Sequence, residues 1–131
     1  MAKKQYFHPL EHIDKIKHPF IASGGTIAKT DVEVTTGTGV LEPGTIMAVD
    51  TTTGKIGQLK DTGSNGENVA RYILAEEIDL ANDKTALVYD MGVFFKEGLI
   101  YPAEFTGDDT KKEKARRQLE EHKIYIRRYV K

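Results

Sequence analysis

Apolar and polar positions alternate most clearly in two stretches near the middle of the chain, residues 70–80 and 85–95. Both stretches are rich in β-branched and aromatic residues, which predicts two β-strands joined by the short linker at residues 81–84. The second strand ends in the adjacent residues Phe94 and Phe95. Neither stretch contains histidine, serine or cysteine, so the pattern predicts a well-formed hairpin with little chemistry of its own.

Shorter strands are predicted upstream of this hairpin. Residues 23–36 are rich in β-branched side chains and favour a strand. Pro43 and Gly44 occupy the two central positions that a type II turn prefers. Residues 45–50 and 55–59 then predict two short strands around the sequence Thr-Thr-Thr-Gly.

One segment near the C-terminus, residues 106–123, predicts an α-helix. Thr110 and Glu113 have the spacing of a capping box at its start. Arg116 and Arg117 each have a glutamate four residues away, which adds a few tenths of a kcal/mol per pair. The apolar side of this helix is thin and consists of Ala115, Leu119 and His122. A helix this polar is expected on a surface or between subunits.

The two ends of the chain have different patterns. Residues 124–130 predict a closing strand with Ile124 and Ile126 on one face. Residues 1–24 lack a sustained period and contain two prolines, so they predict an extended arm that becomes ordered on a partner; the alternative is a tail without a role. The rest of the chain, residues 25–131, is predicted to form a single domain, mainly β with one C-terminal helix, which is the α+β class.

Composition limits the possible functions of the 131 residues. Hydrophobic residues make up 39% and charged residues 30%, a globular balance, and no apolar run approaches the roughly 20 residues that span a bilayer. We therefore expect no membrane partner. The chain has no cysteine, which excludes disulfides, zinc–thiolate sites and thiol nucleophiles.

The net charge of −1 hides a separation of charge along the chain. Residues 19–110 contain six Lys or Arg and fifteen Asp or Glu, whereas residues 111–131 contain nine Lys or Arg and three Glu. A basic end on an acidic body can bind a polyanion or an acidic surface of another subunit. We expect Arg116 and Arg117 to make such a subunit contact.

Candidate catalytic and metal-binding residues are few. Ser23 and Ser64 lie beside glycines and favour turns over a nucleophile. His8 and His12 have a helical metal-ligand spacing, but they lie in the predicted arm, where solvated side chains are the favoured interpretation. Glu77 and Asp79 fall on one face of their predicted strand and Glu76 on the other. Two carboxylates could bind Ca²⁺ or do acid–base work, although a solvent-facing polar row is favoured. The sequence thus predicts no enzyme, no metal and no cofactor.

From residue 41 to residue 130 the chain resembles the lambda-type head decoration proteins of tailed bacteriophages. The similarity is carried by the stretch "ARYILAEEIDLANDKTALVYDMGVFFKEGLIYP", with its "ILAE" strand, its strand ending in Gly-x-Phe and the Leu/Ile pair that follows. The closing stretch "DDTKKEKARRQLEEHKIYI" also fits the family pattern of an Asp-rich entry, a helix and an Ile-rich strand.

The resemblance implies a β-tulip-like fold that assembles as a homotrimer. Such trimers sit on the outside of the expanded icosahedral head at three-fold and quasi-three-fold positions, where they bind the major capsid protein and stabilise the shell against the pressure of the packaged DNA. The arm would pair with capsid backbone, and Phe94 and Phe95 would be core or subunit-contact anchors. The arm residues expected to fill capsid pockets are Tyr6, Phe7, Ile13, Ile16 and Phe20.

Two other functions remain open at the level of the sequence. One is a small β-rich module that binds carbohydrate or a host surface. The other is a nucleic-acid-associated protein that uses the basic C-terminus. The glutamates in that segment and a sequence pI of about 6.4 argue against strong DNA binding, so no direct nucleic-acid contact is expected.

Overall fold

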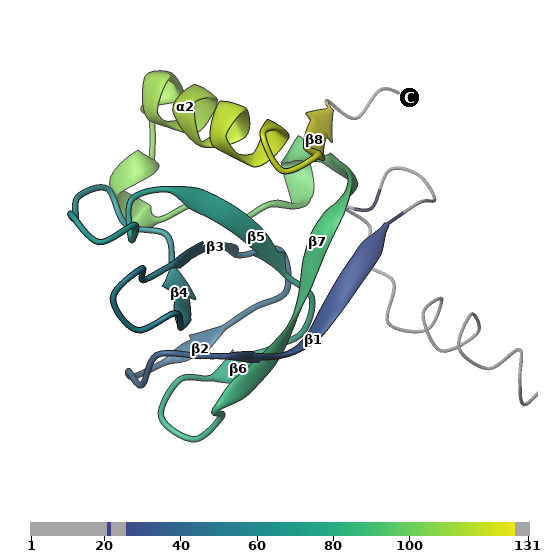
Figure 1. The fold of residues 1–131 in the computed structure, drawn as a ribbon. Coiled ribbons are helices and arrows are strands. Elements are labelled where there is room, and N and C mark those ends of the chain that lie inside the picture. Colours follow the sequence, from purple (N-terminus) through teal and green to yellow (C-terminus); the bar gives the residue numbers. More distant parts are fainter. Residues whose placement is uncertain (1–20, 22–25, 128–131) are drawn as a thin grey trace, which may run out of the picture.

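The computed structural model describes Ile21 and residues 26–127, and it shows a mainly β fold with one α-helix near the C-terminus (Figure 1). The predicted α+β class is therefore confirmed. The elements in chain order are β1 (Ile27–Glu33), β2 (Val40–Leu41), β3 (Ile46–Val49), β4 (Ile56–Gln58), β5 (Ala70–Leu74), β6 (Ile78–Asp79), β7 (Thr85–Phe95), the 3₁₀-helices η1 (Lys96–Gly98) and η2 (Ala103–Phe105), α2 (Asp109–Glu120) and β8 (Ile124–Arg127).

The main sheet follows the antiparallel path β1-β7-β5-β3-β4, and β8 joins it as a parallel neighbour of β7. A separate two-stranded sheet pairs β2 with β6. The main sheet curls strongly, because the chain directly after β1 returns to β4: Val34 and Ile56 form a parallel bridge, and the Thr35 N–H donates to the Ile56 carbonyl at 2.8 Å. The chain that follows β1 therefore touches the opposite end of the sheet path at one point.

Each face of the curled sheet carries its own hydrophobic core. Side chains alternate along the strands, so Ile46 and Ile73 belong to one core, whereas Met47 and Leu74 belong to the other. The first core is completed by residues of η2, α2 and β8, and Figure 1 shows α2 lying across that side. The second core is completed by residues of β2 and β6. This arrangement explains why strands β3 and β5 are buried on both faces.

The predicted first strand of the central hairpin, residues 70–80, is wrong in its extent. Strand β5 ends at Leu74, and Ile78 belongs to β6, which pairs with β2 instead of β7. Glu76 and Glu77 are consecutive exposed residues, and they break the period of two that a continuous strand requires. The Glu76 carboxylate accepts the Leu87 N–H at 2.9 Å, which holds this side chain over β7. The predicted second strand, residues 85–95, is confirmed as β7.

The two short strands predicted at residues 45–50 and 55–59 are confirmed as the antiparallel pair β3 and β4. The type II turn before them is also confirmed. Its central residue Gly44 has a φ of +97°, and the Thr45 N–H donates to the Glu42 carbonyl at 3.2 Å. Of the strand predicted at residues 23–36, residues 23–25 lie outside the described residues, and Ile27–Glu33 form β1.

The capping box predicted at Thr110 and Glu113 is wrong. The N-cap is Asp108, whose carboxylate accepts the Lys111 N–H at 3.1 Å, so α2 begins two residues earlier than a Thr110 cap would allow. Glu113 is unavailable for capping because it binds arginines further along the helix.

The apolar side of α2 is as thin as the sequence predicts. Ala115 and Leu119 are its buried residues, but His122 is exposed and takes no part. In β8, Ile124 and Ile126 are both buried on one face, which confirms that prediction up to residue 127.

Candidate assembly surfaces

Most of the predicted arm lies outside the described residues, including Tyr6, Phe7, Ile13, Ile16 and Phe20. Its one described residue, Ile21, forms an antiparallel bridge with Phe94 of β7 and packs against the core beneath α2. The chain is therefore attached to the sheet at a residue that precedes the predicted boundary.

The two adjacent phenylalanines have different surroundings. Phe94 is fully buried, and its ring centroid lies 5.3 Å from that of Tyr89. Burial of Tyr89 raises the pKa of its phenol above the usual value. Phe95 is half-buried on the opposite face and pairs with Arg127 of β8. The structure thus places Phe94 in the core and leaves part of Phe95 accessible.

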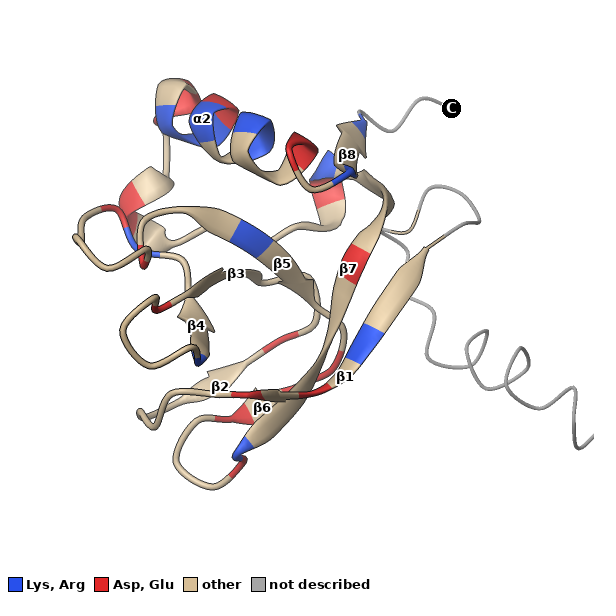
Figure 2. Cartoon of the chain, viewed as in Figure 1, with Lys and Arg blue, Asp and Glu red and all other residues tan. Residues whose placement is uncertain are grey.

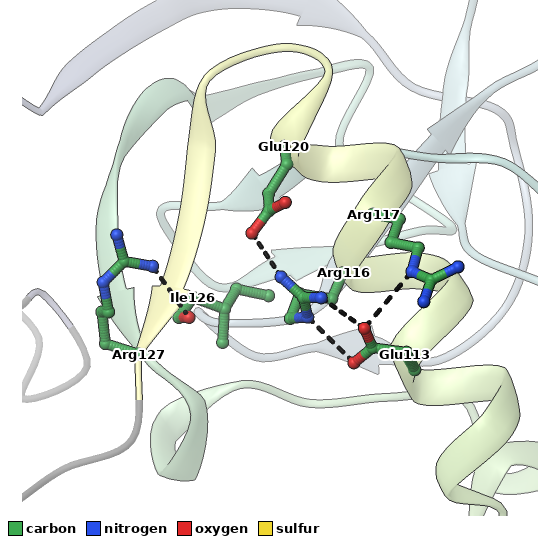
Figure 3. A network of polar contacts seen from close by, with 6 residues as sticks. All are labelled: Glu113, Arg116, Arg117, Glu120, Ile126 and Arg127. Atoms are coloured by element: carbon green, nitrogen blue, oxygen red, sulfur yellow. Dashed lines mark hydrogen bonds and ion pairs between the residues drawn. The ribbon is translucent and has the colours of Figure 1, made fainter.

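The arginines of α2 form a network of ion pairs with glutamates of the same helix (Figure 3). Arg116 lies between Glu113 and Glu120 and binds both carboxylates, and Arg117 contacts Glu113 at 3.3 Å. The hydrogen bond from Arg116 is the main cause that lowers the pKa of Glu113 to about 2. The same hydrogen bond raises the pKa of Arg116. The charge of Arg116 is therefore largely satisfied within its own helix.

Two lysines of α2 also have partners within the subunit. The Lys111 ammonium lies 2.6 Å from the Asp61 carboxylate, and this hydrogen bond is the main cause that raises the pKa of Lys111. Lys112 lies 5.4 Å from the ring centroid of Tyr101, within cation–π range. Burial raises the pKa of the Tyr101 phenol. Figure 2 shows the result as blue and red segments that mix along α2.

Lys114 differs from these neighbours, because it makes no ion pair with any residue that the structure describes. The strongly basic C-terminal segment therefore presents much less unpaired charge than its composition indicates.

The carboxylates considered for catalysis or metal binding are spread apart or used in local structure. Asp79 accepts the Ala81 N–H at 3.0 Å and the Asn82 amide at 2.8 Å, so it shapes the turn before β7. Ser64 lies in an exposed loop. Within residues 26–127 and Ile21, no three His, Asp or Glu side chains come together as a metal site would require. Ser23, His8 and His12 lie outside the described residues.

Strand β1 is a surface that the sequence analysis missed. Six of its seven residues are exposed and Val32 is half-buried, so the strand is open on both faces. Ile27 is 51% exposed, which is unusual for a large aliphatic side chain. The sequence "IAKTDVE" indicates this exposure, because its polar residues fall on both faces of the strand.

These features define a β-rich structural module with an exposed strand and an internally salt-bridged surface helix. A family model described as bacteriophage lambda head decoration protein D matches residues 20–124. The chain belongs to this family of phage head proteins, which confirms the resemblance seen in the sequence, and its role is phage capsid decoration. No individual curated protein matches the chain. None of the described helices is long and apolar enough to cross a membrane.

Proposed function

We propose that the protein binds the outside of the expanded phage head as a homotrimer, at three-fold and quasi-three-fold positions of the shell. There it cements neighbouring copies of the major capsid protein and stabilises the head against internal DNA pressure. The family match over residues 20–124 carries this proposal. In this proposal the protein has the β-tulip-like fold of the family and lies on the outer surface of the virion.

The surface of the single subunit supports assembly. Strand β1 is open on both faces, and the exposed large hydrophobic residues in the described part of the chain are Ile27, Val40, Val69, Ile100 and Tyr125. Closed cyclic assembly would cover such surface without exposing a new edge. Sedimentation equilibrium, together with imaging of decorated heads, tests the trimer: single, scattered subunits in both measurements would contradict it.

The decisive experiment mixes the purified protein with heads that lack decoration, prepared in the expanded and in the unexpanded state. We expect saturable binding to expanded heads and density at the three-fold positions in cryo-electron microscopy. Decorated, DNA-filled heads should also survive heating better than undecorated heads from the same preparation. Equal binding to both states of the shell, or density elsewhere on the head, would contradict the proposal.

The N-terminal arm is proposed to bind capsid backbone as an added strand. A variant that starts at Ile21 keeps the bridge to Phe94 and should melt almost like the full chain, yet bind expanded heads poorly. A variant that starts at Thr26 also loses the half-buried Ile21, which should lower the free energy of unfolding by about 1 kcal/mol. Undiminished affinity of the first variant for expanded heads would show that the arm does not make the contact.

A further inference from the structure

The upstream half of β1 has an edge that pairs with no other described strand. One edge of β1 pairs with β7, and the strand stands at the end of the sheet path. The chain meets β4 only after the strand has ended, at Val34. Between these points, a bulge at Thr30 and Asp31 bends β1, with Asp31 at a φ of +56°. Ile27 to Lys29 therefore offer backbone groups that no other described strand pairs with, and an exposed edge of this kind is a template for another strand.

A second unused edge position lies on β4. The Leu59 N–H donates to the Ile46 carbonyl at 3.0 Å and the Asp50 N–H donates to the Lys55 carbonyl at 2.8 Å, so alternate residues of this segment bond to β3. Because hydrogen-bonded pairs alternate with non-bonded ones, Ile56 and Gln58 direct their N–H and C=O groups away from β3. The Ile56 carbonyl is occupied by Thr35, but the outward backbone groups of Gln58 have no partner among the described residues.

Gln58 borders a groove that suits a single strand. The groove lies between η2 and the chain that follows β1, and its cavity volume is about 510 Å³. Its walls include one cation, Lys60, and one carboxylate, Glu104. The charged residues of β1 are Lys29, Asp31 and Glu33, so a β1 strand in this groove would bring a cation for Glu104 and a carboxylate for Lys60.

We propose that β1 of one subunit lies in the Gln58 groove of the next subunit of the homotrimer. This inference rests on the trimer of the proposed function and adds its interface. A cyclic trimer needs two different, complementary surfaces on every subunit. The β1 edge and the groove are such a pair: each has backbone groups without a partner among the described residues of the subunit, and those of Gln58 can pair with those of the β1 edge. The contact joins the sheets of neighbouring subunits into one ring.

Cysteine cross-linking tests the contact cleanly, because the chain has no native cysteine. Ala28→Cys and Gln58→Cys are prepared as separate single variants, mixed, allowed to reassemble and treated with a short bismaleimide. Only a contact between subunits can then yield a covalent dimer with one chain of each kind. The control mixture combines Ala28→Cys with Thr52→Cys, at an exposed turn after β3. We expect the dimer from the first mixture and little from the control.

A substitution on the groove side provides an independent measurement. Gln58→Pro removes an N–H that points away from β3, a position where an edge strand tolerates proline. Gln58→Ala removes the side chain and keeps the N–H. We expect the proline variant to raise the subunit dissociation constant by about tenfold, as the loss of one backbone hydrogen bond does, and the alanine variant to change it little. Circular dichroism checks that both variants fold.

The outcomes separate the two proposals. A trimeric wild-type protein that gives equal cross-linking in both mixtures, or none in the first, overturns the β1–groove contact and leaves the trimer intact. Equal dissociation constants for two folded Gln58 variants overturn it as well. A wild-type protein that is monomeric in solution and on heads overturns the trimer itself. If the proline variant does not fold, the cross-linking result decides alone.

Discussion

Gly92 of the Gly-x-Phe motif should tolerate a side chain poorly, and Gly92→Ala tests why. Gly92 has a φ of +147°, in a region that residues with a side chain rarely adopt. A Cβ atom there would lie 3.0 Å from Thr26 Oγ1 and 3.1 and 3.2 Å from two atoms of the Phe94 ring. The ring is fully buried and has little room to move. The motif thus places a residue without a side chain directly beneath a core aromatic.

Two effects add up in Gly92→Ala. The unfavourable backbone conformation costs about 1–3 kcal/mol. Insertion of a methyl group against the packed Phe94 ring costs about 1–3 kcal/mol more. We therefore expect the free energy of unfolding to fall by about 2–6 kcal/mol, a large part of the roughly 5–15 kcal/mol typical of a domain. Urea unfolding followed by circular dichroism measures this change.

Gly39→Ala is the matched control. Gly39 also has a positive φ, +99°, but nothing lies within 4 Å of its would-be Cβ. For Gly39→Ala the free energy of unfolding should fall only by the cost of the unfavourable backbone conformation, about 1–3 kcal/mol. If both substitutions destabilise the protein equally, packing against Phe94 is not the reason for the glycine. If Gly92→Ala is as stable as the wild type, the whole argument fails.

Two further predictions concern α2. Lys123 follows the helix with a φ of +65°, the left-handed conformation in which glycine is favoured, so Lys123→Gly should raise the free energy of unfolding by about 1 kcal/mol in thermal melts. Glu113 has a pKa lowered from 4.5 to about 2, so its contribution to stability is complete above pH 4.5 and is lost as the pH falls towards 2. Glu113→Gln should therefore destabilise the protein at pH 7 but leave it nearly equal to the wild type at pH 2; an equal difference at both values would contradict the assignment.

Several elements that depend on neighbouring residues in the sequence were predicted correctly. The turn at Pro43 and Gly44, strand β7 and the buried face of β8 follow from residue type and from a period of two. The break after Leu74 follows from them only in part. The adjacent residues Glu76 and Glu77 interrupt the period of two, but the pairing of β6 with β2 is a contact with residues about forty positions upstream in the sequence. The parallel pairing of β8 with β7 is likewise a long-range contact that no local window contains. The N-cap was misplaced because Asp108 and Thr110 are both good caps.

The assembly surfaces were predicted less well than the fold, and for a different reason. A strand such as β1 is recognised by its alternation of buried and exposed positions, and β1 has almost no buried positions in the subunit. The residues of β1 therefore show no periodicity that would indicate which surface covers the strand. The arm residues also show no sustained period in the sequence. Their assignment depends on capsid pockets and stays a prediction.

Charge reversal can separate the cations of α2 that stabilise the subunit from those available to a neighbour. Arg116→Glu would place a third carboxylate between Glu113 and Glu120, exchanging two attractive pairs for two repulsive ones. Each pair is worth a few tenths of a kcal/mol, so the free energy of unfolding should fall by about 1 kcal/mol. Arg117 is 73% exposed and has one contact, to Glu113, so Arg117→Glu should cost less.

Lys114→Glu is the complementary change, because Lys114 has no ion pair within the described subunit. Its reversal should alter the unfolding free energy by no more than about 0.5 kcal/mol. If the basic face of α2 contacts an acidic neighbour, this variant should weaken assembly or head binding and reduce the dependence of that binding on salt. An assembly defect in Arg116→Glu alone, with a normal salt dependence for Lys114→Glu, would show that the helix charges serve the fold of the subunit and not its contacts.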